Sequence, residues 1–263
     1  MADAPLRAWA TCTKSHSSKL DGCGPCTGNG VSLGVPRTNE SFRQQRDRSH
    51  HHRPSIFENL EYFDLGRDVP LDAMHLFDFG LMKKMFDYLM HTKYPIPNVT
   101  LSPAILRQFD ASFQSLNPFI SRVDFARQPR SIKELPRWKT AEFRQVLLYT
   151  RVVIFKMYLS SAFYLHFLHL HYAVKLLSSS PWYREDNETA FQLIQRFILK
   201  APELYTDKFA CYNLHAAYHV PHQSLHHGLI YGYSAYIMEN HYGHMKHYLV
   251  TYLVRVSSES KNL

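Results

Sequence analysis

The residues from Leu71 to Leu204 contain no stretch of the alternating apolar and polar residues that marks a β-strand. Apolar side chains recur there at helical spacing, and Ser102 followed by Pro103 forms a helix start with a cap and a proline at the first helical position. One apolar stripe comprises Leu71, Met74, Met82, Met85, Phe86 and Leu89. Further helices are predicted over 140–155, 160–179 and 188–205. This part of the chain is therefore predicted to be all-α.

The chain is long and apolar enough to bury a sizeable core. Of its 263 residues, 45% are hydrophobic. The N-terminus has no apolar leader, and charged and histidine residues interrupt the most apolar region, Val146 to Leu177. We predict buried helices without a membrane span, in an intracellular, reducing compartment.

The net charge of +8 is moderately basic. Such a charge favours phosphate-bearing partners, although a solvated basic loop explains it equally well. The Lys and Arg residues are scattered, with clusters in an early loop and around a later connector, namely Arg43, Arg46, Arg48 and Arg53, and Arg127, Arg130, Lys133, Arg137 and Lys139. Contacts with DNA that do not depend on sequence are the functional interpretation.

Two pairs of residues have the spacing of metal ligands. Cys23 and Cys26 flank a Gly-Pro turn, and His215 and His219 lie four positions apart, on one face if the segment is helical. Two thiolates and two imidazoles would complete a tetrahedral zinc site. Two alternatives stand beside this one: a chance His pair in a chain with 17 histidines, and a local ligand set of Cys12, His16, Cys23 and Cys26.

Asp72 and His75 lie three positions apart on a predicted helix, so their side chains can touch. The pair could position a substrate. It could equally be structural, because a carboxylate in the first turn is stabilised by the helix dipole and would satisfy the nearby imidazole.

Several short motifs occur in a characteristic order. They are ADAPLRA, KSHSSKLDGCGPC, RTNESFRQQ, VPLDAMHLFDFGLMKKM, RSIKELPRWKTAEFRQVLLYT, YNLHAAYH and MENHYGHMKHYL. Together they resemble the catalytic region of CACTA-type DDE transposases, in the form found as transposase-domain proteins of animal genomes. The resemblance covers nearly the whole chain.

The resemblance implies an RNase H-like fold in which two Asp and one Glu hold two Mg²⁺ or Mn²⁺ ions. Asp3 matches the second Asp, at the end of a core strand, and Glu239 matches the Glu on the closing helix. Asp72 and His75 match an accessory D-x-x-H signature. The remaining matches, Cys23, Cys26, His215 and His219, imply one shared structural zinc.

The chain begins two residues before Asp3, so the first catalytic Asp and its strands are missing from it. We therefore expect a mainly α protein with a partial RNase H-like core, without its N-terminal strands, and a large all-helical insertion. One domain is expected. Residues 1–31 are expected to contain the end of a core strand and the zinc knuckle, and residues 32–56 a basic polar loop. Residues 57–205 are expected to form the helical insertion, and residues 206–263 to contain the HxxxH motif and the closing helix.

The expected function is that of a nuclear, transposase-derived remnant that binds zinc and DNA nonspecifically. It is expected not to cut or join DNA, since Asp3 and Glu239 lack their third carboxylate. Otherwise Asp3 is an ordinary terminal residue and Glu239 a helix-surface glutamate. The alternative is a helical interaction module without a nucleic-acid role, bound to a host protein or to a second copy of itself. A product that does not fold stably is a third alternative.

Overall fold

The computed structural model describes residues 4–14, 22–28, 31–90, 96, 99–121, 123, 125, 127–150, 152–179 and 184–259. Within these ranges the protein is built from helices and contains no strand. Two isolated bridges, Thr13–His51 and Cys26–Pro36, hold the N-terminal segments together. The prediction of a mainly α protein is confirmed, whereas no sheet of an RNase H-like core lies in the described residues.

The N-terminal region contains two short α-helices, α1 (Ala4–Ala10) and α2 (Asn39–Arg43), and the 3-10 turn η1 (Ile56–Asn59). The strand tail expected within 1–10 is not found at 4–10, where α1 lies; residues 1–3, with Asp3, are outside the described residues. Helix α1 consists largely of good helix formers with a proline in the first turn, and no neighbouring strand of the described chain is present to pair with it. The predicted polar loop at 32–56 is also more ordered than expected, since Phe42 and His50 are buried.

The central helix begins as a π-helix, η2 (Met74–Met82), and continues as α3 (Lys83–Leu89). All six residues of the predicted apolar stripe are buried. The helix packs against α5 and α9, so it lies between the middle of the chain and the segment that carries the histidine pair.

The middle of the chain forms an aromatic core. Its elements are α4 (Pro103–Ser115), η3 (Asn117–Phe119), η4 (Ile132–Arg137), α5 (Thr140–Gln145), the π-helix η5 (Val146–Thr150) and α6 (Val152–Tyr158). Ser102 accepts a hydrogen bond from Ile105 N–H, so the predicted cap before Pro103 is confirmed. Phe86 contacts Phe113, Trp138, Phe143 and Phe155 in the buried centre.

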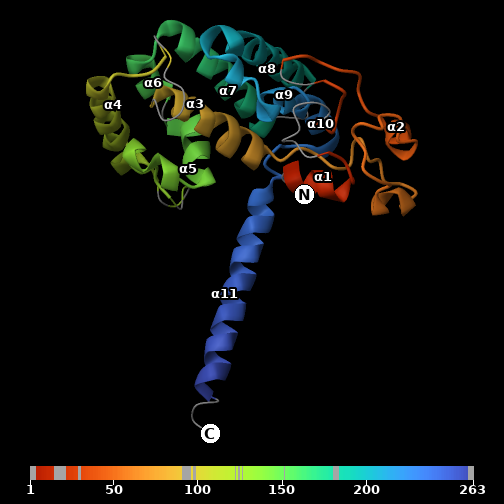
Figure 1. Cartoon of the computed structure of the whole chain (residues 1–263). Helices are drawn as coiled ribbons and strands as arrows, with labels where there is room; N and C mark the ends of the chain where they lie inside the picture. Colours follow the sequence, from red (N-terminus) through yellow and green to blue (C-terminus); the bar gives the residue numbers. More distant parts are fainter. Residues whose placement is uncertain are drawn as a thin grey trace.

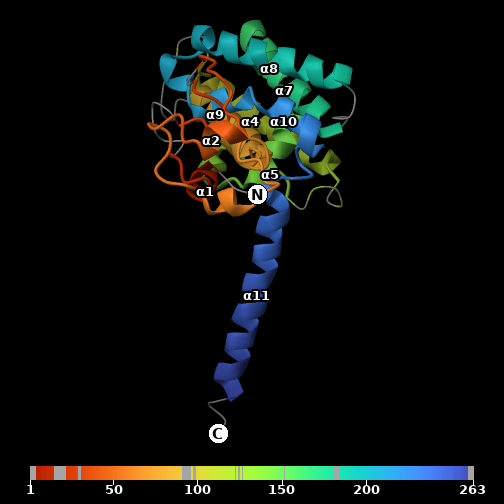
Figure 2. The ribbon, with the colours of Figure 1, turned by 90° about the vertical axis from the view of Figure 1, so that its right-hand side faces the viewer.

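The later helices complete the body around this core. They are α7 (Ser161–Ser179), α8 (Arg184–Leu204), η6 (Asp207–Phe209), α9 (Tyr212–Ala217) and α10 (Val220–His227). Helices α7 and α8 pack side by side, with α9 and α10 against α8 (Figures 1 and 2). One apolar cluster runs from Leu71 to Tyr233, so the segments 57–205 and 206–263 share a core.

The last helix, α11 (Ala235–Glu259), projects from the body in both views (Figures 1 and 2). Its described side chains from Ile237 to Tyr252 are exposed, including several large apolar ones. No helix in the described part of the chain has the length and apolarity needed to cross a membrane.

Candidate metal centre and the acidic residues beside it

The structure brings Cys23, Cys26, His215 and His219 together, with one ligand atom from each lying within 4.8 Å of the others. The two Sγ atoms are 3.7 Å apart, and the two Nε2 atoms are 3.4 Å apart. Cys26 Sγ lies 3.2 Å from His215 Nε2, and Cys23 Sγ lies 3.5 Å from His219 Nε2. Neighbours in space therefore come from opposite ends of the chain.

These distances can be compared with the edges of a zinc tetrahedron. Bonds of about 2.3 Å to sulfur and about 2.0 Å to nitrogen give edges of roughly 3.8 Å between sulfurs, 3.5 Å between sulfur and nitrogen, and 3.3 Å between nitrogens. The sulfur pair, the nitrogen pair and the Cys23–His219 pair agree with these edges to about 0.1 Å, the Cys26–His215 pair at 3.2 Å is shorter, and the other two sulfur–nitrogen pairs lie within 4.8 Å. The four residues can thus hold a metal ion with little rearrangement.

The local backbone structure orients the four ligand side chains toward one another. In the N-terminal knuckle, Gly28 N–H donates to Cys26 Sγ at 3.2 Å. His215 lies within α9, whereas His219 caps the following helix α10, which begins at Val220. The histidines were expected on one helix face, but a tight turn separates their helices, with His219 N–H donating to Ala216 O. The turn still leaves both rings on the same side.

Two buried arginines support the knuckle. Arg37 donates to the main-chain carbonyls of Cys23 and Cys26 and pairs with Asp47. Arg7 packs over Gly24, where an added Cβ would lie 2.7 Å from the Arg7 guanidinium. Positive charge beside the sulfurs favours thiolate, the form that binds metal. Arg7 and Arg37 were not recognised as site residues in the sequence.

The two thiols share their protons unequally. The hydrogen bond between the two thiols lowers the pKa of Cys26 far below its ordinary value. Burial of Cys26 acts in the opposite direction, and hydrogen bonds with His215 and His219 lower the pKa further. The same hydrogen bond, together with burial, raises the pKa of Cys23. Burial likewise lowers the pKa of His219 and keeps its ring neutral, as a metal ligand must be. A divalent ion would displace the proton that remains on Cys23.

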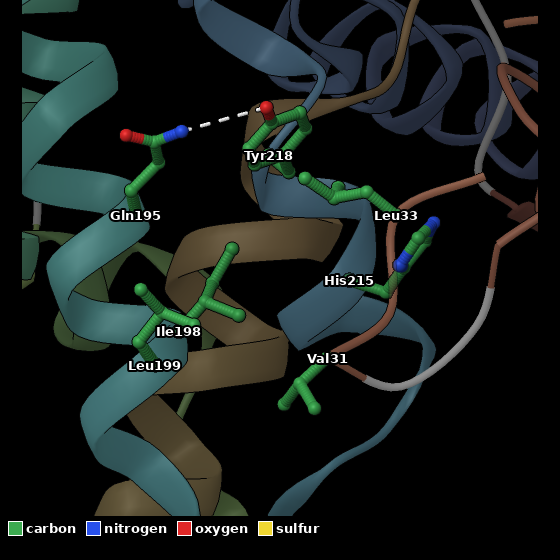
Figure 3. A pocket seen from close by; sticks show the side chains of 7 residues that line it. All are labelled: Val31, Leu33, Gln195, Ile198, Leu199, His215 and Tyr218. Atoms are coloured by element: carbon green, nitrogen blue, oxygen red, sulfur yellow. Dashed lines mark hydrogen bonds between the residues drawn. The ribbon is translucent and has the colours of Figure 1, made fainter. Parts of the chain in front are cut away.

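An apolar wall covers one side of the centre. Val31 and Leu33 from the N-terminal segment face α8 across a cavity of about 60 Å³ that His215 also lines (Figure 3). Tyr218 at its rim accepts a 3.5 Å hydrogen bond from Gln195 (Figure 3). His215 itself is buried, at 2% exposure.

The local ligand set is not formed in the described residues. The Cys12 side chain is outside the cluster, and its sulfur donates to Trp9 O at 3.7 Å. His16 lies outside the described residues. The described structure therefore supports the shared set of two Cys and two His.

Asp72 joins two helix starts. Its carboxylate accepts from His75 N–H at 3.0 Å, from Ala235 N–H at 2.7 Å and from the His75 ring at 2.5 Å. Burial opposes ionisation, but these hydrogen bonds outweigh it and lower the pKa of Asp72. The geometry favours a structural role, because one carboxylate fixes the start of η2 and the start of α11.

Glu239 lies close to this pair, with Oε1 3.7 Å from His75 Nε2. Its side chain is 59% exposed. Asp3 lies outside the described residues. Among the described side chains, Asp72, His75 and Glu239 do not belong to a cluster able to hold a metal; the Cys/His group is the cluster found there.

A buried carboxyl beside these residues was missed in the sequence. Asp78 is fully buried and accepts from Tyr231 at 2.8 Å and from Tyr236 at 3.0 Å. Burial raises the pKa of Asp78 to about 8. The sequence could have indicated this burial, because Asp78 is in the middle of the apolar run MHLFDFGLM. A lone acidic residue in such a run is buried together with the helix.

Some basic residues expected to face phosphate are used internally. Arg43 donates to three main-chain carbonyls, of Glu58, Leu60 and Phe63. Arg130 forms a two-pronged pair with the buried Glu142. The exposed basic side chains of the connector are Arg127, Lys133, Arg137 and Lys139.

Comparisons of the chain with protein-family models, with curated proteins and with solved structures found no match. No family is assigned on that basis.

Proposed function

We propose that the chain is a zinc-stapled remnant of a DDE transposase that binds DNA without cutting it. The observation that supports this most strongly is the tetrahedral spacing of Cys23, Cys26, His215 and His219, which the transposase resemblance implies as one zinc set. The soft thiolate and imidazole donors select zinc over Mg²⁺ or Ca²⁺. Bound there, zinc supplies a structural crosslink.

The acidic residues support the absence of DNA cleavage. Two-metal hydrolysis needs carboxylates that hold both ions about 3.5–4 Å apart. Asp72 is occupied by hydrogen bonds to two helix starts, and Glu239 is an exposed residue whose carboxylate lies 3.7 Å from the His75 ring. Neither residue offers a bridging carboxylate for Mg²⁺ or Mn²⁺.

The proposed DNA contacts involve the exposed connector residues and the phosphate backbone. Binding of a fluorescent DNA duplex should weaken as salt rises. Replacing Lys133, Arg137 and Lys139 together by Gln should reduce the slope of log K against log salt by about 2 to 3, if each contacts one phosphate. The matched control is Lys200→Gln, an exposed lysine of α8 that pairs with Glu203. No binding at low salt, or an unchanged slope in the triple variant, contradicts the proposal. A nuclear location is part of this proposal.

A second candidate function is self-association through α11. Met238, Tyr242, Met245, Leu249 and Tyr252 follow alternating steps of four and three residues, which is the seam of a coiled coil. They are 40–66% exposed. An antiparallel copy would place Tyr242 against Tyr252 and Met245 against Leu249, so the seam complements itself. This observation favours an interaction module whose partner is a second copy.

Sedimentation of the full chain tests that candidate. Leu249→Glu should convert dimer to monomer, because it buries a charge in the seam. Val250→Glu is the matched control, since Val250 is exposed but lies outside the seam. A monomeric wild-type chain at high concentration, or equal effects of the two variants, would reject the α11 seam.

A further inference from the structure

An open hollow of about 890 Å³ lies between α5, η5 and the start of α11. Its polar lining comes from Arg127, Arg144, Gln145, Glu239 and Asn240. Aromatic side chains complete it, namely Phe125, Tyr149 and Tyr236. The volume is in the range of small-molecule sites, which are mostly apolar with a few convergent polar groups.

Gln145 is the first sign of a ligand. Its side chain is fully buried at the wall of the hollow. Neither the amide oxygen nor the amide nitrogen has a hydrogen-bond partner within the described part of the chain. A buried amide without hydrogen bonds is unfavourable, so a partner that offers one donor and one acceptor would be favoured there.

Arg144 is the second sign. Its guanidinium stacks 3.8 Å from the centre of the Tyr231 ring and 5.3 Å from that of Tyr236. Its Nε is buried without a hydrogen-bond partner, and no carboxylate is found paired with Arg144 in the described residues. Asp78 beneath the tyrosines leaves this charge largely uncompensated at neutral pH, since burial raises the pKa of its carboxyl to about 8. The guanidinium is therefore available to an anion.

We propose that this hollow binds a nucleotide, with its phosphate on Arg144 and its base against Gln145 and the tyrosine wall. Arginine provides several fixed donors that suit a phosphate, and Arg127 at the rim adds a second positive charge. A Gln amide pairs with the donor and acceptor edge of a base, and aromatic rings stack on its face. Glu239 would repel phosphate, so the base or sugar end lies toward α11.

The nucleotide has two sources, a free mononucleotide or an unpaired nucleotide of single-stranded DNA. Both present the same phosphate, sugar and base. The inference goes beyond the proposed duplex contacts, because it concerns a hollow and not the exposed side chains of Lys133, Arg137 and Lys139. It does not depend on zinc chemistry.

The test uses the zinc-loaded full chain and a fluorescent single-stranded 12-mer, with AMP and inorganic phosphate as competitors. Arg144→Gln should weaken binding of the 12-mer about tenfold or more. Gln145→Met, which keeps the side-chain volume and removes the amide, should weaken it several-fold. The matched control Arg196→Gln alters an exposed arginine of α8 and should leave binding unchanged. Circular dichroism identifies any variant that fails to fold, and Arg144→Gln keeps the test open if Gln145→Met does.

Each outcome decides a point. Competition by AMP, but not by equal phosphate, supports a mononucleotide site; variant-sensitive 12-mer binding without AMP competition supports the single strand as the source. Equal competition by phosphate and AMP overturns base recognition, and unchanged binding in both hollow variants overturns the site. Duplex binding and its salt slope, measured on the same variants, show whether the connector contacts fail separately.

Discussion

Cys26 Sγ lies 3.2 Å from His215 Nε2, although 189 positions separate the two residues in the chain. The contact joins the N-terminal knuckle to α9, which packs on the central helix. A metal ion held there would close most of the chain into one loop.

Gly80 permits the close approach of α9 to the central helix. A Cβ at Gly80 would lie 2.3 Å from Asn213 Nδ2 and 2.6 Å from the His75 carbonyl oxygen. Gly80→Ala should therefore displace α9, destabilise the protein by about 1–3 kcal/mol and weaken metal binding. Thermal unfolding and a zinc titration of the variant measure both effects.

Gly243 supplies the control for that substitution. It lies on the exposed helix α11, and a Cβ there would meet nothing within 4 Å. Gly243→Ala should be neutral or stabilise by up to about 1 kcal/mol, because alanine is the better helix former. Equal effects of the two substitutions would rule out the packing role of Gly80.

Asp72→Ala should loosen two helix starts together. The substitution removes the carboxylate oxygens that accept hydrogen bonds from Ala235 N–H and His75 N–H. A lost helix cap costs about 1–2 kcal/mol, and a buried unpaired N–H adds to that. Hydrogen exchange should accelerate at Ala235 and His75. Unchanged exchange at both amides would mean that Asp72 does not hold them, and would favour its alternative role in positioning a substrate.

Stability should fall as the pH is lowered from about 6.5 to about 4. Burial lowers the pKa of His166 to about 4, while its hydrogen bond with the Phe197 carbonyl oxygen partly opposes this. The unfolded chain therefore takes up a proton at a higher pH than the folded chain, so protonation favours unfolding in that interval. The interval corresponds to roughly 3 kcal/mol.

Urea unfolding of His166→Gln at several pH values isolates this contribution. Glutamine retains a donor for the Phe197 carbonyl but does not titrate, so the fall between pH 6.5 and pH 4 should be smaller than in the wild type. His244→Gln, at an exposed position of α11, is the control. Identical pH profiles for His166→Gln and the wild type would contradict the assignment.

Periodicity was sufficient to predict much of the helical body. The six residues of the stripe from Leu71 to Leu89 are all buried, and Ser102 caps its helix as expected. These features depend on residues near one another in sequence, where spacing and caps determine structure. A helix lies at 4–10 where a strand tail was expected, because a strand depends on a distant partner, which no local pattern reveals.

The site was predicted in part. Spacing alone indicated Cys23 with Cys26 and His215 with His219, but choosing the shared set over the local one required the resemblance. Buried supporting groups such as Arg7 and Arg37 were missed, because a basic residue in a polar segment carries no sign of burial. The same holds for Gln145, whose unsatisfied amide emerges only once the helices are packed.

The metal content of the purified full chain tests the central claim most directly. Mass spectrometry should find one zinc per chain in the wild type and in Cys12→Ser, and none in Cys23→Ser or His215→Ala. Loss of zinc should also lower the unfolding temperature, because binding energy at a structural site contributes to folding. Zinc retained in His215→Ala, or lost in Cys12→Ser, would contradict the shared centre. Either result would favour the local ligand set of Cys12, His16, Cys23 and Cys26.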